Sequence, residues 1–240
     1  MPGATGSARG TRPELPPRRR SGQPADRSRQ PAGRSRQPAD RSGQPADRPE
    51  QVRTAALELF AAHGYRATTV DEIGARVGIR GPSVYKHFRS KQELLVDVVV
   101  GTTDAMLAAQ RAAVRSAGDV RGQLRRAVEA HVRFHAEHPR EAFVAGREVD
   151  SLPEPHRSSV LRKQAEYERR LRRLVETGAR DGVFAVESPR LAAYAILDMG
   201  AGVAGRFRSG GAVDRDELAT RYAEFALRLV GARRAGRRSG

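Results

Sequence analysis

The chain has 240 residues and a formal net charge of +16, and it contains no cysteine. The lack of cysteine excludes thiolate nucleophiles, cysteine-ligated zinc and disulfides. No apolar run follows the basic N-terminus, so no signal peptide is expected. The most apolar stretch, residues 191–205, is short for a membrane span and carries Asp198. We therefore expect a cytoplasmic, nucleoid-associated protein with no membrane partner.

Two basic, low-complexity segments flank the part of the chain that is expected to fold. Residues 1–48 carry eleven Arg against four acids, and residues 231–240 carry four Arg and no acid. Residues 20–47 repeat every seven residues, but each unit holds a Pro and no large apolar residue, so no coiled-coil seam can form. We predict a disordered extension over residues 1–48 and a disordered tail over residues 232–240. The extension is either a solvating segment or a basic arm that strengthens non-specific DNA binding.

Residues 49–64 form the first predicted helix, because apolar residues recur there at helical spacing. Thr69 and Glu72 then make a capping-box pair that starts a second, short helix, and Gly78 can end it. Gly81-Pro82 starts a third helix, since Pro is tolerated in a first helical turn. Two short helices around a tight turn predict a helix-turn-helix, whose second helix would enter a DNA major groove.

The charge of this segment agrees with DNA binding. Between Arg76 and Lys91 there are five Lys or Arg, one His and no acid. Such a local excess of cations is typical of a phosphate-binding surface. A charged helix face can also be a merely solvated surface, so the charge pattern alone leaves both interpretations open.

The same segment resembles the DNA-binding signature of the TetR family of bacterial regulators. The resemblance covers residues 50–97 and rests on Thr68-Thr69, Ile73, Gly78-Ile79, Val84-Tyr85, His87-Phe88, Ser90-Lys91 and Glu93-Leu94. It departs from the family pattern at Arg80, where a helix-capping Ser is common, and at Pro82, where Gly is common. Lys86 is the best candidate base reader. The full set of candidate DNA-contacting residues is Thr69, Arg80, Gly81, Pro82, Ser83, Tyr85, Lys86, His87 and Lys91.

The remaining helices follow from caps and apolar spacing. We predict helices over residues 90–116, 119–138, 139–149, 156–179, 188–207 and 214–230. No stretch alternates apolar and polar residues as a strand does, so the fold is expected to be all-α with about nine helices. We expect a three-helix helix-turn-helix domain over residues 49–97 and a ligand-binding and dimerisation domain over residues 98–231.

No motif nominates a catalytic group, a cofactor site or a metal site. Gly200 to Gly205 match G-x-G-x-x-G, but a helical pattern precedes them, so they favour close helix packing over a nucleotide loop. His131, His135 and His138 share a helical face, yet without further ligands they favour structural or pocket-lining roles over a metal site. The chain is therefore predicted not to be an enzyme and to need no cofactor.

The second predicted domain carries candidate ligand and dimer residues. Its apolar and aromatic residues are either core or cavity lining, and Arg147 could meet an anionic ligand. The ligand-binding candidates are Met106, Phe134, Phe143, Arg147, Tyr167 and Leu174. The resemblance implies a homodimer built on residues 189–207 and 214–230, and the candidates for its interface are Tyr194, Gly202, Phe207, Tyr222 and Phe225.

The C-terminal half also resembles a TetR branch associated with lipid or steroid catabolism and acyl-CoA effectors. This likeness lies in R-E-V-D-S-L-P-E-P-H-R at residues 147–157 and S-P-R-L-A-A-Y-A-I-L-D-M at residues 188–199. Residues and resemblance together predict a homodimeric repressor that binds a pseudo-palindromic operator in double-stranded DNA. A small-molecule effector, with acyl-CoA as the candidate, would release it. The alternative is a helical ligand-binding or catalytic domain whose helix-turn-helix is vestigial.

Overall fold

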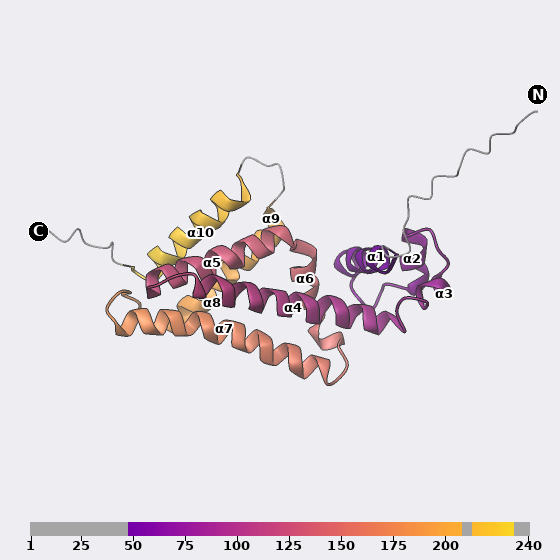
Figure 1. Ribbon diagram of the computed structural model, residues 1–240, viewed down its shortest axis with the longest axis horizontal. Coiled ribbons are helices and arrows are strands. Elements are labelled where there is room, and N and C mark those ends of the chain that lie inside the picture. The colour runs from indigo at the N-terminus through magenta and orange to yellow at the C-terminus, as the bar shows by residue number, and fades with distance from the viewer. Residues whose placement is uncertain (1–47, 208–212, 233–240) are drawn as a thin grey trace, which may run out of the picture. The chain divides into compact units, whose positions relative to one another are not determined.

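The computed structural model describes residues 48–207 and 213–232, and all regular structure in these ranges is helical (Figure 1). The predicted extension up to residue 47, the glycine pair at 210–211 and the tail from residue 233 lie outside the described residues. The helices are α1 (Arg48–His63), α2 (Val70–Arg76), α3 (Gly81–Val84), α4 (Lys91–Arg115), α5 (Val120–Glu137), α6 (Pro139–Arg147), the 3-10 helix η2 (Val149–Ser151), α7 (His156–Arg180), α8 (Pro189–Ala201), α9 (Val203–Arg206) and α10 (Arg215–Leu229). Only Gly202 separates α8 from α9, and counted as one they give nine α-helices in the described part of the chain. The all-α fold predicted from the sequence is confirmed.

The helix starts are set by local capping residues. The side chains of Thr69, Ser90 and Asp119 each accept a hydrogen bond from the backbone N–H three residues on. Ser188 does the same for Leu191, whereas Asp214 accepts from the N–H only two residues on. Each cap satisfies a backbone donor that the first helical turn leaves without a partner, which is why short polar residues mark these starts in the sequence.

A first hydrophobic core joins α1, α2, α3 and the first half of α4. Phe60, Ile73, Val84 and Leu95 are almost completely buried in it. Burying side chains of this size contributes about 1.5–3 kcal/mol each. The same core continues into α6, η2 and the start of α7 through Val144, Val149, Leu152 and Val160. The helix-turn-helix is therefore packed against the following helices, and α4 runs unbroken through the domain boundary predicted at residues 97–98.

A second core joins α5, α7, α8 and α10. It is built from the buried residues Leu124, Val132, Leu171, Ile196 and Ala223, among others. Helix α5 packs against α4, α8 and α10, and so lies inside this group of helices (Figure 1). The small residues of α10 that face α5 allow close approach, because Ala219, Ala223 and Ala226 are all buried.

In the described part of the chain, no helix combines the length and apolar character needed to cross a membrane.

Candidate nucleic-acid interface and internal cavity

The turn between α2 and α3 has the geometry expected of a helix-turn-helix. Gly78 has φ +71°, a conformation that side chains with a Cβ rarely adopt, and Ile79 N–H donates to Gly74 O at 2.9 Å to close the turn. Gly81 is buried against α2, where a Cβ would overlap the Asp71 carboxylate. Pro82 lies in the first turn of α3, as predicted. The regular helix α3 ends at Val84, and Tyr85 to His87 continue as a turn.

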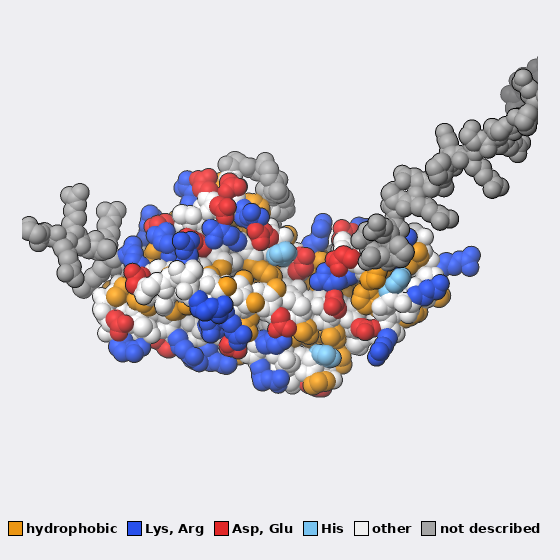
Figure 2. Space-filling model, viewed as in Figure 1, with side chains coloured by type: hydrophobic (Ala, Val, Ile, Leu, Met, Phe, Trp, Pro, Cys, Tyr) orange, Lys and Arg blue, Asp and Glu red, His pale blue; other side chains and the backbone are white. Residues whose placement is uncertain are grey.

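Three cations on this surface are exposed and unengaged. The side chains of Arg80, Lys86 and Arg89 have no hydrogen-bond or ion-pair partner among the described residues, and all three are exposed. Pro82, Tyr85 and His87 are also exposed, Tyr85 to 53%, whereas Ser83 is half-buried. Lys and Arg side chains project beside α2 and α3, at the right of the view in Figure 2. An exposed aromatic ring between free cations on an acid-free turn suits a phosphate and groove surface.

The side chains of Thr69 and Lys91 form hydrogen bonds within the protein. The Thr69 hydroxyl accepts from Glu72 N at 3.2 Å and donates to the Glu72 carboxylate at 2.9 Å. The Thr69 backbone N–H also donates to this carboxylate, at 2.7 Å, and the two hydrogen bonds from Thr69 to the carboxylate lower the pKa of Glu72. Lys91 Nζ donates to Tyr65 O at 2.8 Å and to Thr68 O at 2.6 Å, and it lies 4.3 Å from the Tyr65 ring centroid. Lys91 is among the predicted DNA contacts, and in the structure its ammonium donates to carbonyls that follow α1.

A polar link joins α6 to the loop after α1. Glu148 Oε1 accepts from Tyr65 N at 3.2 Å, and its other oxygen accepts from the Ser151 hydroxyl at 3.0 Å. Gln92 on α4 donates to Ser151 O at 2.7 Å. These hydrogen bonds connect both ends of the helix-turn-helix to the segment that follows α6. A shift of α6 would therefore move the helix-turn-helix.

A cavity of about 220 Å³, partly open to solvent, lies among α4, α5, α6, α7 and α8. Its lining is Thr103 and Met106 from α4, His135 from α5, Ala142, Ala145 and Gly146 from α6, Gln164, Tyr167 and Glu168 from α7, and Leu197 and Ala201 from α8. Of the six ligand candidates, Met106 and Tyr167 are in this lining. The cavity wall includes α6, the helix that carries the link to Tyr65.

A buried hydrogen-bonded cluster forms one wall of the cavity. His131 Nδ1 lies 2.9 Å from the Tyr167 hydroxyl and its Nε2 lies 3.0 Å from Leu197 O. His135 Nδ1 lies 2.9 Å from His131 O. Burial lowers the pKa of His131 to about 3, burial also lowers the pKa of His135, and burial raises the pKa of Tyr167. Among the described residues no group of three or more His, Cys, Asp or Glu could hold a metal ion.

The other four ligand candidates lie outside this cavity. Phe134 stacks on His138, with ring centroids 4.9 Å apart, and Leu174 packs against the second core. Phe143 is 46% exposed, and the Arg147 guanidinium lies 5.6 Å from its ring centroid. Apolar spacing alone could not separate these positions from the cavity lining, because cavity and core residues share the same helical faces.

The dimer candidates gather on α8, α9 and α10. Tyr194 accepts a hydrogen bond from Arg190 Nε at 2.9 Å, and the rings of Tyr222 and Phe225 lie 5.8 Å apart. Gly202 separates α8 from α9, and Phe207 ends α9 half-buried. Phe225 is 46% exposed, and two further residues that the sequence did not nominate, Leu191 and Leu229, are 65% and 42% exposed. Exposed large apolar side chains on neighbouring helices are a sign of an interface.

Comparison with known proteins gives this architecture a family. The model for bacterial regulatory proteins of the tetR family matches residues 52–98, and the model for the tetracyclin repressor-like C-terminal domain matches residues 117–230. The HTH-type transcriptional repressor KstR2 of Rhodococcus jostii is 32% identical over 175 residues, which span 72% of this chain and 85% of that protein. The HTH-type transcriptional activator FasR of Mycolicibacterium smegmatis is 36% identical over 116 residues, which span 48% of this chain and 52% of that protein.

A solved structure agrees. A bacterial regulatory protein in the tetR family from Rhodococcus RHA1 superposes with a TM-score of 0.69 at 33% identity, covering 78% of this chain and 98% of that one. Fold and surface together define a helix-turn-helix transcriptional regulator. The chain belongs to the TetR family, whose members are regulators rather than enzymes.

Proposed function

We propose that the chain is a homodimeric repressor that binds a pseudo-palindromic operator in double-stranded DNA and is released by a small molecule. The observation that carries DNA binding is the presence of exposed, unengaged cations, Arg80 and Lys86 among them, on the acid-free turn around α3. We assign base reading to Lys86, since a Lys side chain in the major groove can donate to guanine acceptors. Tyr85 and His87 would contact phosphate beside it. Such a protein acts on chromosomal DNA in the cytoplasm.

The two parts of the chain would divide the work. Residues 49–97 would read DNA, and residues 98–231 would bind the effector and form the dimer. Support for the dimer comes from Leu191, Phe225 and Leu229, which give α8 and α10 an exposed apolar surface. Two-fold symmetry then requires two half-sites about 34–36 Å apart, one helical turn of DNA.

The effector would bind in the cavity, and its binding would displace α6. The Glu148 link from α6 to Tyr65, and the shared first core, give a displaced α6 a direct path to the helix-turn-helix. The proposed dimer would have two forms that differ in the distance between its two α3 helices. An effector that binds more tightly to the form whose distance does not match the half-sites would shift the population away from operator binding.

The sequence likeness to the lipid and steroid branch makes acyl-CoA esters the candidate effector class. A cavity of about 220 Å³ is smaller than the ~300–1,000 Å³ that encloses a drug-sized ligand. We infer that only the acyl portion of such an ester would be enclosed. Titrating acyl-CoA esters into an operator complex tests this class, and no release by any of them would count against it.

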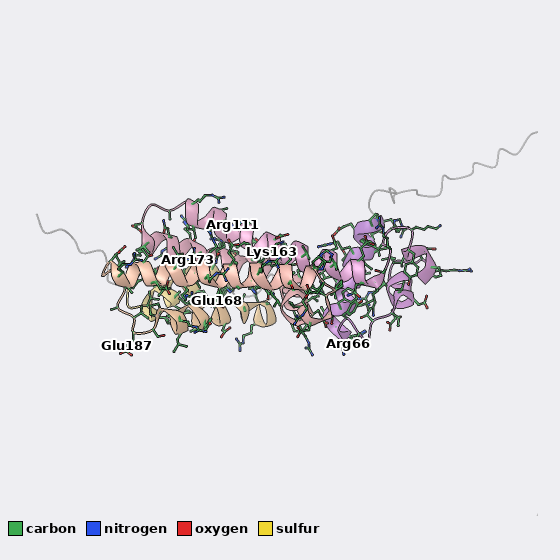
Figure 3. The ribbon with its side chains drawn as sticks, turned by 90° about the horizontal axis from the view of Figure 1, so that it is seen from below. Arg66, Arg111, Lys163, Glu168, Arg173 and Glu187 are labelled. Atoms are coloured by element: carbon green, nitrogen blue, oxygen red, sulfur yellow. The ribbon has the colours of Figure 1, made fainter. Side chains whose placement is uncertain are left out.

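The test of DNA binding compares three single variants on operator fragments recovered from genome-wide binding. We expect Lys86→Ala and Arg80→Ala each to weaken operator binding about 5- to 150-fold, because a groove contact is worth ~1–3 kcal/mol. The matched control is Arg173→Ala, which removes the same charge from an exposed position on α7 (Figure 3). Affinity measured across salt concentrations should be salt-dependent for the wild type.

Two results would contradict the proposal. Wild-type affinity in both Lys86→Ala and Arg80→Ala at physiological salt would refute the contact assignment. No salt-sensitive binding to any duplex would instead favour a helical ligand-binding or catalytic domain with a vestigial helix-turn-helix.

A further inference from the structure

The hydrogen-bond inventory of the cavity restricts the chemistry of the effector. This inference rests on the proposed function only for the claim that effector binding releases DNA. Binding of the effector to the cavity can be measured on the chain without DNA. Five polar side chains line the cavity, and the partner that each already has decides what it can still offer a ligand.

The two histidines have fixed tautomers, because a carbonyl oxygen can only accept. His135 Nδ1 lies 2.9 Å from His131 O, so Nδ1 carries the hydrogen and Nε2 is left as an acceptor. His131 Nε2 lies 3.0 Å from Leu197 O, so this nitrogen carries the hydrogen of that ring. His131 Nδ1 is then the acceptor for the Tyr167 hydroxyl at 2.9 Å, which leaves the Tyr167 oxygen with lone pairs only.

The remaining polar groups add more acceptors than donors. The Thr103 hydroxyl donates to Val99 O at 2.8 Å, so its oxygen can only accept from a ligand. Glu168 brings a carboxylate that accepts no hydrogen bond among the described residues and interacts electrostatically with Arg190. Gln164 uses one N–H on Ala145 O at 3.3 Å and keeps the other. With the Gln164 amide oxygen, the cavity therefore offers five acceptor groups against a single spare N–H.

The charges of the lining residues also disfavour an anionic ligand. Among the described residues that line the cavity there is no Lys or Arg. Of the nearby cations, Lys163 pairs with Asp104 and Arg111 pairs with Glu166. Arg190 donates to the Tyr194 hydroxyl and also interacts electrostatically with Glu168. Lys163, Glu168 and Arg173 follow one another along α7, with Arg111 beside them (Figure 3). An anionic group enclosed here would add to the negative charge of Glu168, whose Coulombic partner Arg190 is not in the lining, and it would leave the acceptors without hydrogen atoms.

The remaining lining residues restrict the size and the apolar character of the ligand. Met106, Ala142, Ala145, Gly146, Leu197 and Ala201 present hydrocarbon or bare backbone. A cavity of about 150 Å³ with an apolar lining is large enough for benzene. The cavity of about 220 Å³ is therefore suited to a substituted ring or a short branched chain.

We propose that the portion of the effector enclosed in this cavity is a compact hydrocarbon body that carries a hydrogen-bond donor, a hydroxyl or an amine, directed at His135 Nε2. A carboxylate, an ether or an unsubstituted acyl chain lacks this donor. An acyl-CoA effector would thus be one whose enclosed acyl group is hydroxylated or aminated.

The test uses four probes with one skeleton on the unaltered full chain without DNA: 3-phenylpropan-1-ol, its methyl ether, 3-phenylpropylamine and 3-phenylpropanoate. Affinity is measured by calorimetry, and the ¹⁵N resonance of His135 Nε2 is followed by NMR. We expect the alcohol or the amine to bind at least about tenfold more tightly than the ether and the acid, because a donor-free ligand leaves buried acceptors unpaired. Whichever of the two binds more tightly identifies the donor, and it should move the Nε2 resonance.

A pair of variants adds a second readout. His135→Phe should remove the preference for the donor-bearing probe, whereas His156→Phe, an exposed change at the start of α7, should keep it. Because the comparison of probes needs no variant, a poorly folded His135→Phe leaves the test intact. An ether or acid that binds as tightly as the alcohol and amine overturns the proposal, and so does the absence of binding by all four. Since neither measurement involves DNA, these failures are separate from a failure of operator binding.

Discussion

His131 is a titratable side chain held neutral by its surroundings. Both ring nitrogens are hydrogen-bonded, to the Tyr167 hydroxyl and to Leu197 O, and the residue is only 5% exposed. A proton added to Nδ1 would break the hydrogen bond from Tyr167 and put a charge in a buried site beside His135. The cluster thus makes the stability of the fold sensitive to pH above the range where carboxyls titrate.

We predict that the chain loses stability as the pH falls from 7 to 5. The pKa of His131 is about 3 in the folded chain, and about 6.5 is its ordinary value in an unfolded chain. Between these values the unfolded chain binds more protons, so the free energy of unfolding falls with falling pH. The expected loss from His131 is about 2 kcal/mol between pH 7 and pH 5, and His135 adds to it in the same direction.

Urea unfolding at pH 5, 6 and 7 measures this slope. Carboxyls whose pKa is lowered, such as Glu72 and Asp216, lose their contribution from about pH 5 downward, so their effect falls mostly below this window. His131→Gln, which does not titrate, should flatten the dependence. An unchanged slope in His131→Gln would show that the protonation of other groups causes it.

At the scale of helices, the sequence predicts those features that depend on interactions between residues close together along the chain. Caps act within three residues, so Thr69, Ser90 and Asp119 marked helix starts correctly. Lys91 and Glu148 were beyond such reasoning, because their partners around Tyr65 lie 26 and 83 residues away along the chain. The same limit explains why Met106 and Phe134 appeared equivalent in the sequence although the cavity touches only Met106.

The packing of α5 against α8 gives a second prediction. Gly200 faces His131 so closely that a Cβ would overlap the imidazole ring, which its two hydrogen bonds hold in place. We expect Gly200→Ala to lower the free energy of unfolding by about 1–3 kcal/mol, as overpacking does in a well-filled core. The measurement is urea unfolding at pH 7.

A matched control keeps the chemistry of the substitution and changes only the surroundings. Gly101 is exposed in the middle of α4, and a Cβ there meets nothing within 4 Å. Gly101→Ala should raise the stability by about 0.5–1 kcal/mol, because Ala has the higher helix propensity. Equal effects at the two positions would mean that α8 can move away from His131 without cost.

At the scale of the whole molecule, the proposed operator recognition would depend on two copies being held at a fixed separation. One α3 would contact one half-site, and linking two of them would make the second contact intramolecular, which multiplies the affinity without adding contacts. The surface proposed to hold the copies together would therefore affect DNA binding from a distance.

We predict that Phe225→Glu converts the dimer into monomers, whereas Phe143→Glu does not. Both Phe residues are 46% exposed, so the two substitutions add the same charge at equally accessible positions. Phe225 on α10 lies in the proposed interface, and Phe143 lies on α6, outside it. A carboxylate desolvated in an apolar interface with no partner costs several kcal/mol, enough to dissociate it. Sedimentation velocity at micromolar concentration measures the mass.

Operator affinity should follow the oligomeric state. Phe225→Glu should bind the full operator at least about tenfold more weakly, because the two half-sites no longer bind as a linked pair. Its affinity for an isolated half-site should match that of the wild type, since Arg80 and Lys86 are untouched. Lys86→Ala should do the reverse, keeping the dimer and losing both affinities. A dimeric Phe225→Glu chain with full operator affinity would place the interface on another surface.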